Sequence, residues 1–249
     1  MLPKLQVIMP MAGNGERFKK EGFKVAKPLI KIGNLPMFQW ALKSLEGFNL
    51  SMKVILIVKE LDSIDFRESL IDTYWENKVE IFCAPSSTRG AAETVSLVEN
   101  LVDLSSSLLI MDCDMYFKGR EFQEFIENKL EHDSALITFS SDKDFYSYIT
   151  KSDGYAVDIA EKRKISNMAV AGAYFWRSAG DFFLHASHFL SEDTIDYANE
   201  KYLSGVVKKS ISKNLRFRIF QTEFHSFGTP DELDSFKKSP LFKEMLNSG

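Results

Sequence analysis

The sequence is poor in the residues that staple small folds or hold metal clusters. Its 249 residues include two cysteines and four histidines. Cys83 and Cys113 each lie in an apolar run, and neither has another Cys or His at metal-ligand spacing. This pattern argues against a disulfide scaffold, and we interpret both cysteines as reduced core residues.

Long hydrophobic runs are also missing. No segment approaches the roughly 20 apolar residues that a membrane-spanning helix needs. The apolar run in the N-terminal stretch MLPKLQVIMPM is too short for a signal peptide. We therefore expect a cytoplasmic protein with no membrane partner.

The chain has no excess of positive charge. It carries 31 Lys and Arg against 35 Asp and Glu, a formal net charge of -4. This balance argues against a nucleic-acid binder that works through a general basic field, so any polyanion must be held locally. Hydrophobic residues make up 45% and charged residues 27%, which is globular composition.

What the chain does have is an alternation of short apolar runs with longer amphipathic stretches. The series reads LQVIMP, PMFQWALKSLEGF, KVILIVK, SIDFRESLIDTYWEN, VEIFCAP, GAAETVSLVENLV, SLLIMDCD and REFQEFIENKLEH. This rhythm predicts an α/β fold of Rossmann-like type, with a mixed, mostly parallel sheet flanked by helices. Because ligands bind beyond the carboxyl ends of such strands, the loops after VIMP, IFCA and LIMD should meet at one crevice.

The pattern changes after Leu136. Shorter strand candidates follow (SALITFS, GYAVDIA, MAVAGAYFW), then two helices, a strand LRFRIFQ and a terminal helix opened by GTPDEL. No Pro/Gly/Ser-rich linker separates the two patterns. We predict a single domain over residues 1–249, with one half at 1–133 and a second half with C-terminal helices at 134–249.

A glycine loop follows the first strand in VIMPMAGNGERFKKEGFKVAKPLI. Gly13 and Gly15 let backbone amides turn toward an anion, and a helix N-terminus after them can add its dipole. Arg17 supplies a fork of donors for phosphate oxygens, and Lys27 supplies a compact charge. The loop lacks the third glycine of the dinucleotide fingerprint and the Gly-Lys-Ser/Thr ending of the phosphate loop.

Two carboxylates end a later strand, in LLIMDCDMYF. Alternation along the strand puts Asp112 and Asp114 on one face, close enough to hold a hard cation that keeps several waters. Mg²⁺ is the expected metal, with Mn²⁺ as an alternative. The plain alternative is that the pair caps the next helix.

MAGNGERF followed by KPLIKIGNLPMFQWALKSL resembles the signature of the nucleotidyltransferase family that includes sugar-1-phosphate nucleotidylyltransferases. The resemblance implies the nucleotide-diphospho-sugar transferase fold, with residues 1–133 as the nucleotide-binding half and residues 134–249 as the acceptor-binding half. It also implies catalytic roles: Arg17 stabilises the departing pyrophosphate, Lys27 steadies the α-phosphate, and Asp114 holds the metal, with Asp112 as a second candidate ligand. The nucleotide-binding residues that it implies are Met11, Ala12, Gly13, Asn14, Gly15, Gly90, Ala91 and Ala92.

The stretch APSSTRGAAETVSLV matches the place where the family presents a helix start to the base and ribose. Its small residues permit close approach, although alanines are also simply good helix formers. Relatives that use thymidine or uridine triphosphates commonly carry a glutamine at the head of this loop. Here that position corresponds to Ala84, which slightly favours CTP.

DGYAVDIAEKRKISNMAVAGAYFW resembles the acceptor segment of the family. The resemblance implies that Glu161 accepts hydrogen bonds from acceptor hydroxyl or amine groups and that Lys162 holds the acceptor phosphate. Asn167 and Gly172 complete the implied substrate-binding set. By charge alone, the run EKRK is typical of a solvated turn.

FHSFGTPDEL resembles the closing motif of the family, in which an aspartate shortly before Gly-Thr often supplies a second metal carboxylate. That position corresponds to Ser226 here, so a second metal ligand is not identified by the sequence. His225, beside it, is more typical of a structural than of a catalytic histidine.

Together these motifs predict a magnesium-dependent nucleotidyltransferase. A nucleoside triphosphate and a phosphorylated small metabolite would give an activated product and pyrophosphate. The resemblance points to a subgroup that serves capsule and surface-polysaccharide synthesis. The acceptor is left open between a sugar 1-phosphate and a non-sugar phosphate that resembles phosphocholine or phosphoglutamine.

Two other functional classes compete with this prediction. A metal-dependent glycosyltransferase could use a sugar nucleotide through the Asp-x-Asp motif, but Gly-x-Gly-x-Arg followed by Lys-Pro does not fit it. A catalytically silent relative would normally lose Arg17, Lys27 or Asp114, and all three are present. A homodimer is compatible with the family, although no segment identifies an interface.

Overall fold

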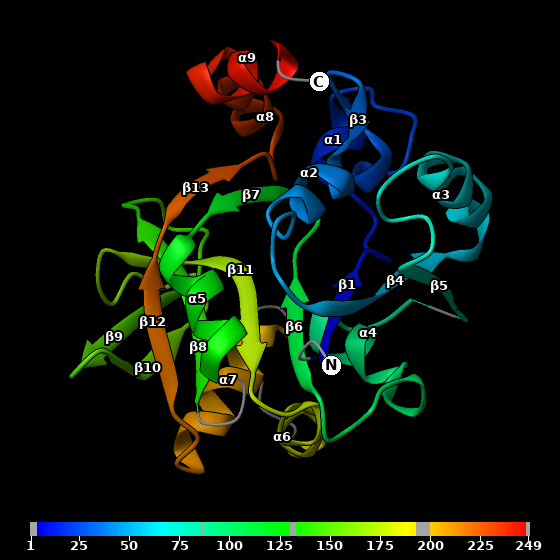
Figure 1. Cartoon of the computed structure of the whole chain (residues 1–249). Helices are drawn as coiled ribbons and strands as arrows, with labels where there is room; N and C mark the ends of the chain where they lie inside the picture. The colour runs from blue at the N-terminus through cyan, green and yellow to red at the C-terminus, as the bar shows by residue number, and fades with distance from the viewer. Residues whose placement is uncertain (1–3, 86, 130–132, 193–199, 248–249) are drawn as a thin grey trace.

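The computed structural model describes residues 4–85, 87–129, 133–192 and 200–247. Among these residues, nine strands form one mixed sheet with helices on both faces (Figure 1). The strands of this sheet are β1 Lys4–Pro10, β4 Ser51–Lys59, β5 Val79–Ala84, β6 Ser107–Met111, β8 Ser134–Ser140, β9 Tyr148–Ser152, β10 Tyr155–Ala160, β11 Met168–Trp176 and β12 Phe217–Gln221. Short strands also pair outside it, β2 Lys31–Ile32 with β3 Leu35–Pro36 and β7 Met115–Lys118 with β13 Glu223–Ser226.

Helices alternate with the strands along most of the chain. They are α1 Glu16–Lys20, α2 Met37–Lys43, α3 Ser63–Leu70, α4 Ala91–Ser96, α5 Arg120–Lys129, α6 Ala179–Ser191, α7 Leu203–Ser212, α8 Pro230–Lys238 and α9 Pro240–Asn247. Short 3-10 helices are η1 Lys27–Leu29, η2 Glu60–Asp62 and η3 Glu99–Leu101. The described helices do not include one long and apolar enough to cross a bilayer.

The strand order is β5-β4-β1-β6-β11-β8-β12-β10-β9. The four strands from the first half, β5, β4, β1 and β6, run parallel to one another, as the βαβ rhythm predicts. β11 pairs antiparallel with β6, with Ala173 opposite Met111, and so joins the two halves into one sheet.

The sheet is mixed as predicted, but parallel pairing does not dominate its second half. There β8 and β12 are parallel, whereas β11–β8, β10–β12 and β10–β9 are antiparallel. For β9 and β10 the reason is local: these strands are joined by Asp153 and Gly154, both with positive φ (50° and 82°). A two-residue turn of this kind reverses the chain directly, so no crossover helix is needed.

The two sheet faces bury alternate residues of each strand. On β1, Leu5, Val7 and Met9 pack into a core cluster with residues of α2, α3 and α5. Ile8 points to the opposite cluster, which α4, α6 and α7 cover. The period-two alternation of a strand therefore produces a three-layer structure in which helices cover the sheet on both sides.

A third core cluster joins the two ends of the chain. Phe18, between Gly15 and Lys27, and Trp40 of α2 pack with Phe236 and Phe242 of α8 and α9. The Trp40 and Phe236 rings meet edge to face, with centroids 5.3 Å apart. The C-terminal helices, assigned in sequence to the acceptor half, thus pack on the nucleotide half.

Local signals explain several element boundaries. The Thr229 hydroxyl accepts from the backbone N–H of Glu232, and Pro230 occupies the first turn, so α8 begins where GTPDEL predicts. In contrast, the expected helix over SIDFRESLIDTYWEN ends at Leu70, because Asp72 adopts a left-handed φ of 59°.

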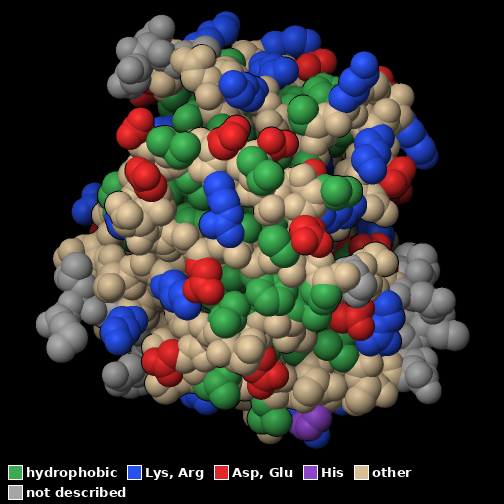
Figure 2. Space-filling model, turned by 90° about the vertical axis from the view of Figure 1, so that its right-hand side faces the viewer, with side chains coloured by type: hydrophobic (Ala, Val, Ile, Leu, Met, Phe, Trp, Pro, Cys, Tyr) green, Lys and Arg blue, Asp and Glu red, His purple; other side chains and the backbone are tan. Residues whose placement is uncertain are grey.

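The surface agrees with the mixed charge of the sequence. On the face shown in Figure 2, Lys and Arg side chains are interspersed with Asp and Glu side chains. This face therefore offers no broad area of one sign.

Candidate active site

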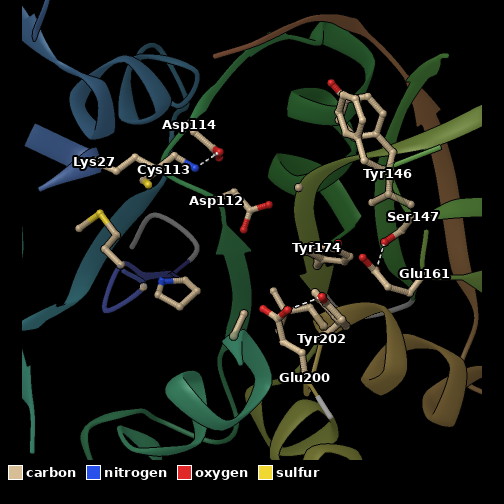
Figure 3. A pocket seen from close by; sticks show the side chains of 18 of the residues that line it. Lys27, Asp112, Cys113, Asp114, Tyr146, Ser147, Glu161, Tyr174, Glu200 and Tyr202 are labelled. Carbon is tan, nitrogen blue, oxygen red and sulfur yellow. Dashed lines mark hydrogen bonds and ion pairs between the residues drawn. The ribbon is translucent and has the colours of Figure 1, made fainter. Parts of the chain in front are cut away.

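A cavity of about 380 Å³ opens beyond the carboxyl ends of β1 and β6 (Figure 3). Residues from both halves of the chain line it, which places the glycine loop opposite the acceptor segment. The lining residues with polar or charged groups, or from the glycine loop, are Met11, Gly13, Gly15, Arg17, Lys27, Asp112, Cys113, Asp114, Tyr146, Ser147, Glu161, Lys162, Tyr174, Glu200 and Tyr202.

Gly15 brings the glycine loop against Lys27. Its φ of 64° is left-handed, and a Cβ at this position would lie 3.0 Å from the Cβ of Lys27. Both observations require glycine. The helix that follows, α1, has only five residues, so the cationic side chains rather than a long helix dipole supply the positive charge.

Lys27 forms the central ion pair of the site. Its Nζ donates to Oδ2 of Asp114 at 2.5 Å, and both side chains are mostly buried. Burial by itself lowers the pKa of the Lys27 ammonium, but the nearby acidic groups, with Asp114 first among them, together outweigh this effect and the pKa is raised. Lys27 therefore stays charged beside the cavity.

Asp112 has no such partner. Its Oδ2 lies 2.4 Å from the point that a Cβ on Gly172 would occupy, and Gly172 has a left-handed φ of 70°. Within the described ranges, no group donates a hydrogen bond to this carboxylate. Burial, and then the nearby charge of Asp114, raise the pKa of Asp112 to about 7.

These two carboxylates fit a hard divalent cation. The described residues contain no group of three or more His, Cys, Asp or Glu side chains that could enclose a metal ion. Mg²⁺, however, is commonly bound through one or two carboxylates together with substrate phosphates. The raised pKa of Asp112 indicates uncompensated negative charge, which a cation would neutralise.

Across the cavity, Glu161 and Lys162 are tightly held. Oε2 of Glu161 accepts hydrogen bonds from the hydroxyls of Ser147 and Ser204. Lys162 has a left-handed φ of 47°, and its backbone N–H donates to the carbonyl of Tyr146 at 3.1 Å. These contacts fix two neighbouring side chains of opposite charge at the cavity wall.

Tyr202 contacts the side chain of Lys162. The Nζ of Lys162 donates to the hydroxyl of Tyr202 and lies 4.3 Å from the centre of its ring. The Tyr202 hydroxyl in turn donates to Glu200 (Figure 3). Burial, and then the Glu200 carboxylate, raise the pKa of Tyr202, so this hydroxyl stays protonated at neutral pH.

Arg17 is more open. Its guanidinium lies 5.9 Å from the centre of the Phe145 ring, and in the described part of the chain it makes no ion pair. Cys113, between the two aspartates, is buried, and burial raises the pKa of its thiol. Arg17 is therefore available to an anion, whereas Cys113 is a poor nucleophile.

The structure brings most of the sequence-predicted residues together. Met11, Gly13, Gly15, Arg17, Lys27, Ala91, Asp112, Asp114, Glu161, Lys162 and Gly172 line the cavity. Five others lie outside its lining: Ala12, Asn14, Gly90, Ala92 and Asn167.

The residues outside the lining have identifiable surroundings. Asn14 accepts a hydrogen bond from Lys59 at 2.6 Å, and Ala92 is fully buried in the core. A Cβ on Gly90 would lie 2.6 Å from the carbonyl oxygen of Lys201. Asn167 is exposed on the loop before β11.

Sequence reasoning missed the residues that close the acceptor side. Phe145, Tyr146 and Ser147 come from the loop between β8 and β9, and Glu200 and Tyr202 precede α7. None of them belongs to a motif. Their only signal is that polar and aromatic side chains cluster in DFYSY and EKY, next to predicted element ends.

A further carboxylate approaches Asp114 from α8. Gly228 lies close to both carboxylates. A Cβ added to it would be 2.5 Å from Oδ2 of Asp114 and 3.6 Å from Oε2 of Glu232. Ser226, at the expected aspartate position, donates to Glu232 at 2.9 Å. Tyr146 also donates to Glu232, so its carboxylate ties α8 to the β8–β9 loop.

The chain also matches known proteins in sequence. Residues 6–211 match the Nucleotidyl transferase family. The bifunctional protein GlmU of Oenococcus oeni is 26% identical over 145 residues, which are 58% of this chain and 30% of that protein. The matching segment therefore spans less than a third of the length of this relative.

Solved structures share the fold. A nucleoside-diphosphate-sugar pyrophosphorylase from Vibrio cholerae superposes with a TM-score of 0.81 at 22% identity, covering 94% of this chain and all of the other. An inositol-1-phosphate CTP transferase from T. maritima gives 0.77 at 16% identity, covering 98% and 95%. A UDP-glucose pyrophosphorylase in complex with UDP-glucose gives 0.76 at 14%, covering 98% and 100%.

The likeness to solved structures confirms the predicted mixed α/β fold, with helices that flank the sheet. The family match covers the glycine loop, the aspartate pair and the acceptor segment in one continuous span. The chain belongs to the Nucleotidyl transferase family, as its sequence motifs indicate.

Proposed function

We propose that this protein joins a nucleoside triphosphate to a phosphorylated small metabolite and releases pyrophosphate. An oxygen of the acceptor phosphate attacks the α-phosphorus, and the bond from this phosphorus to the bridging oxygen of the pyrophosphate breaks. The observation that carries the proposal is the single cavity in which Arg17, Lys27 and Asp114 face Glu161 and Lys162. One cavity with cations on two sides suits two phosphate-bearing substrates.

The triphosphate side rests on fixed positive charge. Lys27, held charged by Asp114, would contact the α-phosphate, where negative charge increases during attack. Arg17, which has no ion pair among the described residues, would bind the departing pyrophosphate through its fork of donors. The glycine loop at Gly13 and Gly15 lets the triphosphate approach the backbone closely.

The acceptor side rests on Glu161 and Lys162. Lys162 would bind the acceptor phosphate, and its aromatic partner Tyr202 limits where its ammonium can lie. Glu161 would accept a hydrogen bond from a hydroxyl or amine of the acceptor. An ionised phosphate is already a nucleophile, so catalysis consists mainly of positioning and charge neutralisation.

Asp112 and Asp114 would hold a Mg²⁺ ion, with Mn²⁺ as an alternative. When bound, this ion would supply positive charge that offsets the negative charge of the triphosphate in the transition state. In the protein itself, Gly172 leaves the room that Asp112 needs to face the cavity.

CTP is the proposed nucleotide by a small margin. Support comes from Ala84 at the position where relatives specific for thymine or uracil carry glutamine. The similar fold of an inositol-1-phosphate CTP transferase is consistent with this choice. The acceptor is proposed to be a sugar 1-phosphate or a phosphocholine- or phosphoglutamine-like compound, used in capsule or surface-polysaccharide synthesis.

The test is a screen for pyrophosphate release. Purified protein with Mg²⁺ is mixed with each of ATP, GTP, CTP, UTP and dTTP, and with α-glucose 1-phosphate, phosphocholine or phosphoglutamine. The proposal expects pyrophosphate in at least one mixture, with CTP the best nucleotide. Transfer of sugar from UDP-glucose without pyrophosphate release would favour the glycosyltransferase alternative instead.

A further inference from the structure

We propose that Ser147 and Ser204 are positioning residues that aim the free carboxylate oxygen of Glu161 at the acceptor. The inference rests on the proposed function of this cavity. Its basis is the hydrogen bonding of Glu161, whose two oxygens have different surroundings.

Both serine hydroxyls donate to the same oxygen. Ser204 Oγ lies 2.7 Å from Oε2 of Glu161, and Ser147 Oγ donates to Oε2 from the other side. Among the described residues, no donor contacts Oε1. A carboxylate with one occupied and one free oxygen has a fixed orientation, and the free oxygen remains available for a substrate donor.

The two serines are themselves well anchored. Ser147 and Ser204 are 8% and 3% exposed, so neither hydroxyl is lost to bulk water. Ser147 directly precedes β9, and its backbone carbonyl accepts from the N–H of Val170 on β11 at 2.8 Å. Ser204 is the second residue of α7. The clamp therefore joins the sheet to a helix on either side of Glu161.

The same segments carry other groups that line the cavity. The loop that ends in Ser147 includes Phe145, which lies over Arg17, and Tyr146, whose carbonyl holds the N–H of Lys162. The segment that leads to Ser204 includes Tyr202, which holds the Lys162 ammonium. Glu161 and Lys162 are thus oriented by the same two segments, from opposite sides.

A purely structural role would give a different result from a positioning role. If the serines only stabilise the fold, their loss lowers stability and affects both substrates or neither. If they aim Glu161, their loss selectively weakens use of the acceptor. The effect should then disappear when the Glu161 carboxylate is absent.

The kinetic test uses Ser147→Ala and Ser204→Ala. Each variant is assayed with Mg²⁺, CTP and whichever of α-glucose 1-phosphate, phosphocholine or phosphoglutamine supports turnover. The expected result is a rise of about tenfold in KM for the acceptor, with KM for CTP within about twofold, which corresponds to about 1.4 kcal/mol of lost interaction. In the Glu161→Ala background, either serine change should alter the acceptor KM by less than about twofold.

Ser210→Ala is the matched control. Ser210 also lies on α7 and is fully buried, but its hydroxyl donates only to the backbone carbonyl of Val206. It should leave both KM values unchanged. Equal effects on the two substrates, or full serine effects without the Glu161 carboxylate, would overturn the inference.

Crystal structures of the variants give a second readout that needs no acceptor. Loss of either hydroxyl should let the Glu161 side chain occupy more than one conformer, whereas the parent protein keeps one. A single unchanged conformer in both variants would contradict the clamp. If the parent protein releases no pyrophosphate with any tested pair, the proposed function fails, and the crystallographic result alone decides on the serines.

Discussion

The ammonium of Lys27 lies 2.5 Å from a carboxylate oxygen of Asp114, although 87 residues separate them in sequence. Lys27 follows the glycine loop, and Asp114 lies between β6 and β7. The pairing keeps a positive charge beside the cavity, while the carboxylate of Asp112, two residues away, accepts no hydrogen bond from the residues that the structure describes. Phosphoryl transfer with a bound cation requires positive charge beside the phosphate oxygens and negative charge beside the cation.

Lys27→Ala and Asp114→Ala should each lower kcat at least a hundredfold, because both remove electrostatic stabilisation of the transition state. Pyrophosphate release measures the effect, and circular dichroism checks that the fold is intact. Lys31→Ala, which removes an exposed lysine on β2, is the control and should retain activity. Near-normal turnover in either active-site variant would contradict the assigned roles.

Gly172→Ala should abolish most activity, because its Cβ would lie 2.4 Å from the carboxylate of Asp112. The left-handed φ adds a strain of roughly 1–2 kcal/mol. Gly154→Ala separates the two effects, since Gly154 has a similar φ of 82° but no atom within 4 Å of the added Cβ. Both variants should lose stability in urea unfolding, and only Gly172→Ala should lose activity by tenfold or more. Equal activities would show that the position of Asp112 does not matter.

Asp112→Asn should stabilise the metal-free protein at high pH. Burial and Asp114 raise the pKa of Asp112 to about 7 in the folded protein, against about 3.9 in an unfolded chain. Between these two pH values, the Asp112 carboxyl has lost its proton in the unfolded chain but keeps it in the folded protein. The free energy of unfolding of the wild type therefore falls as pH rises and levels off above about pH 7. The asparagine variant avoids this loss.

Urea unfolding with EDTA at pH 4.5, 6 and 8 measures this difference. The stability gain of Asp112→Asn should be largest at pH 8 and smallest at pH 4.5. Asp231→Asn, at an exposed position of α8, should show no comparable trend. A gain that is independent of pH would contradict the raised pKa of Asp112.

Tyr202→Phe should weaken use of the acceptor while it leaves the fold intact. The change keeps the ring beside Lys162 but removes the hydroxyl that links Lys162 to Glu200. The acceptor KM should rise by about threefold to tenfold, which corresponds to the roughly 0.5–1.5 kcal/mol of one ordinary intramolecular hydrogen bond. Tyr155→Phe removes a hydroxyl that contacts Asp133 and Arg216 outside the cavity, and it should change neither KM.

The sequence was informative where function depends on short motifs. The βαβ rhythm predicted the parallel strands β5, β4, β1 and β6, and the segments that follow β1, β5 and β6 do contribute to one cavity. Gly15, Arg17, Lys27 and the two aspartates all lie within a few residues of those strand ends or in the segment that follows them. Strand alternation and glycine placement are local, so they can be recognised in a sequence.

The acceptor wall could not be predicted in this way. Tyr146 and Ser147 reach the cavity only because β9 and β10 fold back as a hairpin, and Tyr202 only because its segment precedes α7. Glu232 fits the pattern of a helix-capping residue, yet its carboxylate contacts Tyr146. Such contacts depend on tertiary packing, which leaves no spacing pattern in the sequence.

The central claim is that the nucleotidyl group of a nucleoside triphosphate, with its α-phosphate, is transferred to an acceptor phosphate and that pyrophosphate leaves. The most direct measurement incubates the protein and Mg²⁺ with [α-³²P]CTP or [γ-³²P]CTP and each of α-glucose 1-phosphate, phosphocholine and phosphoglutamine. The account predicts an acceptor-dependent product labelled only from the α-position, with the γ-label recovered in pyrophosphate, and loss of both signals in Lys27→Ala. Acceptor-dependent transfer of the γ-label, or no transfer from any of the five triphosphates in the screen, would contradict it.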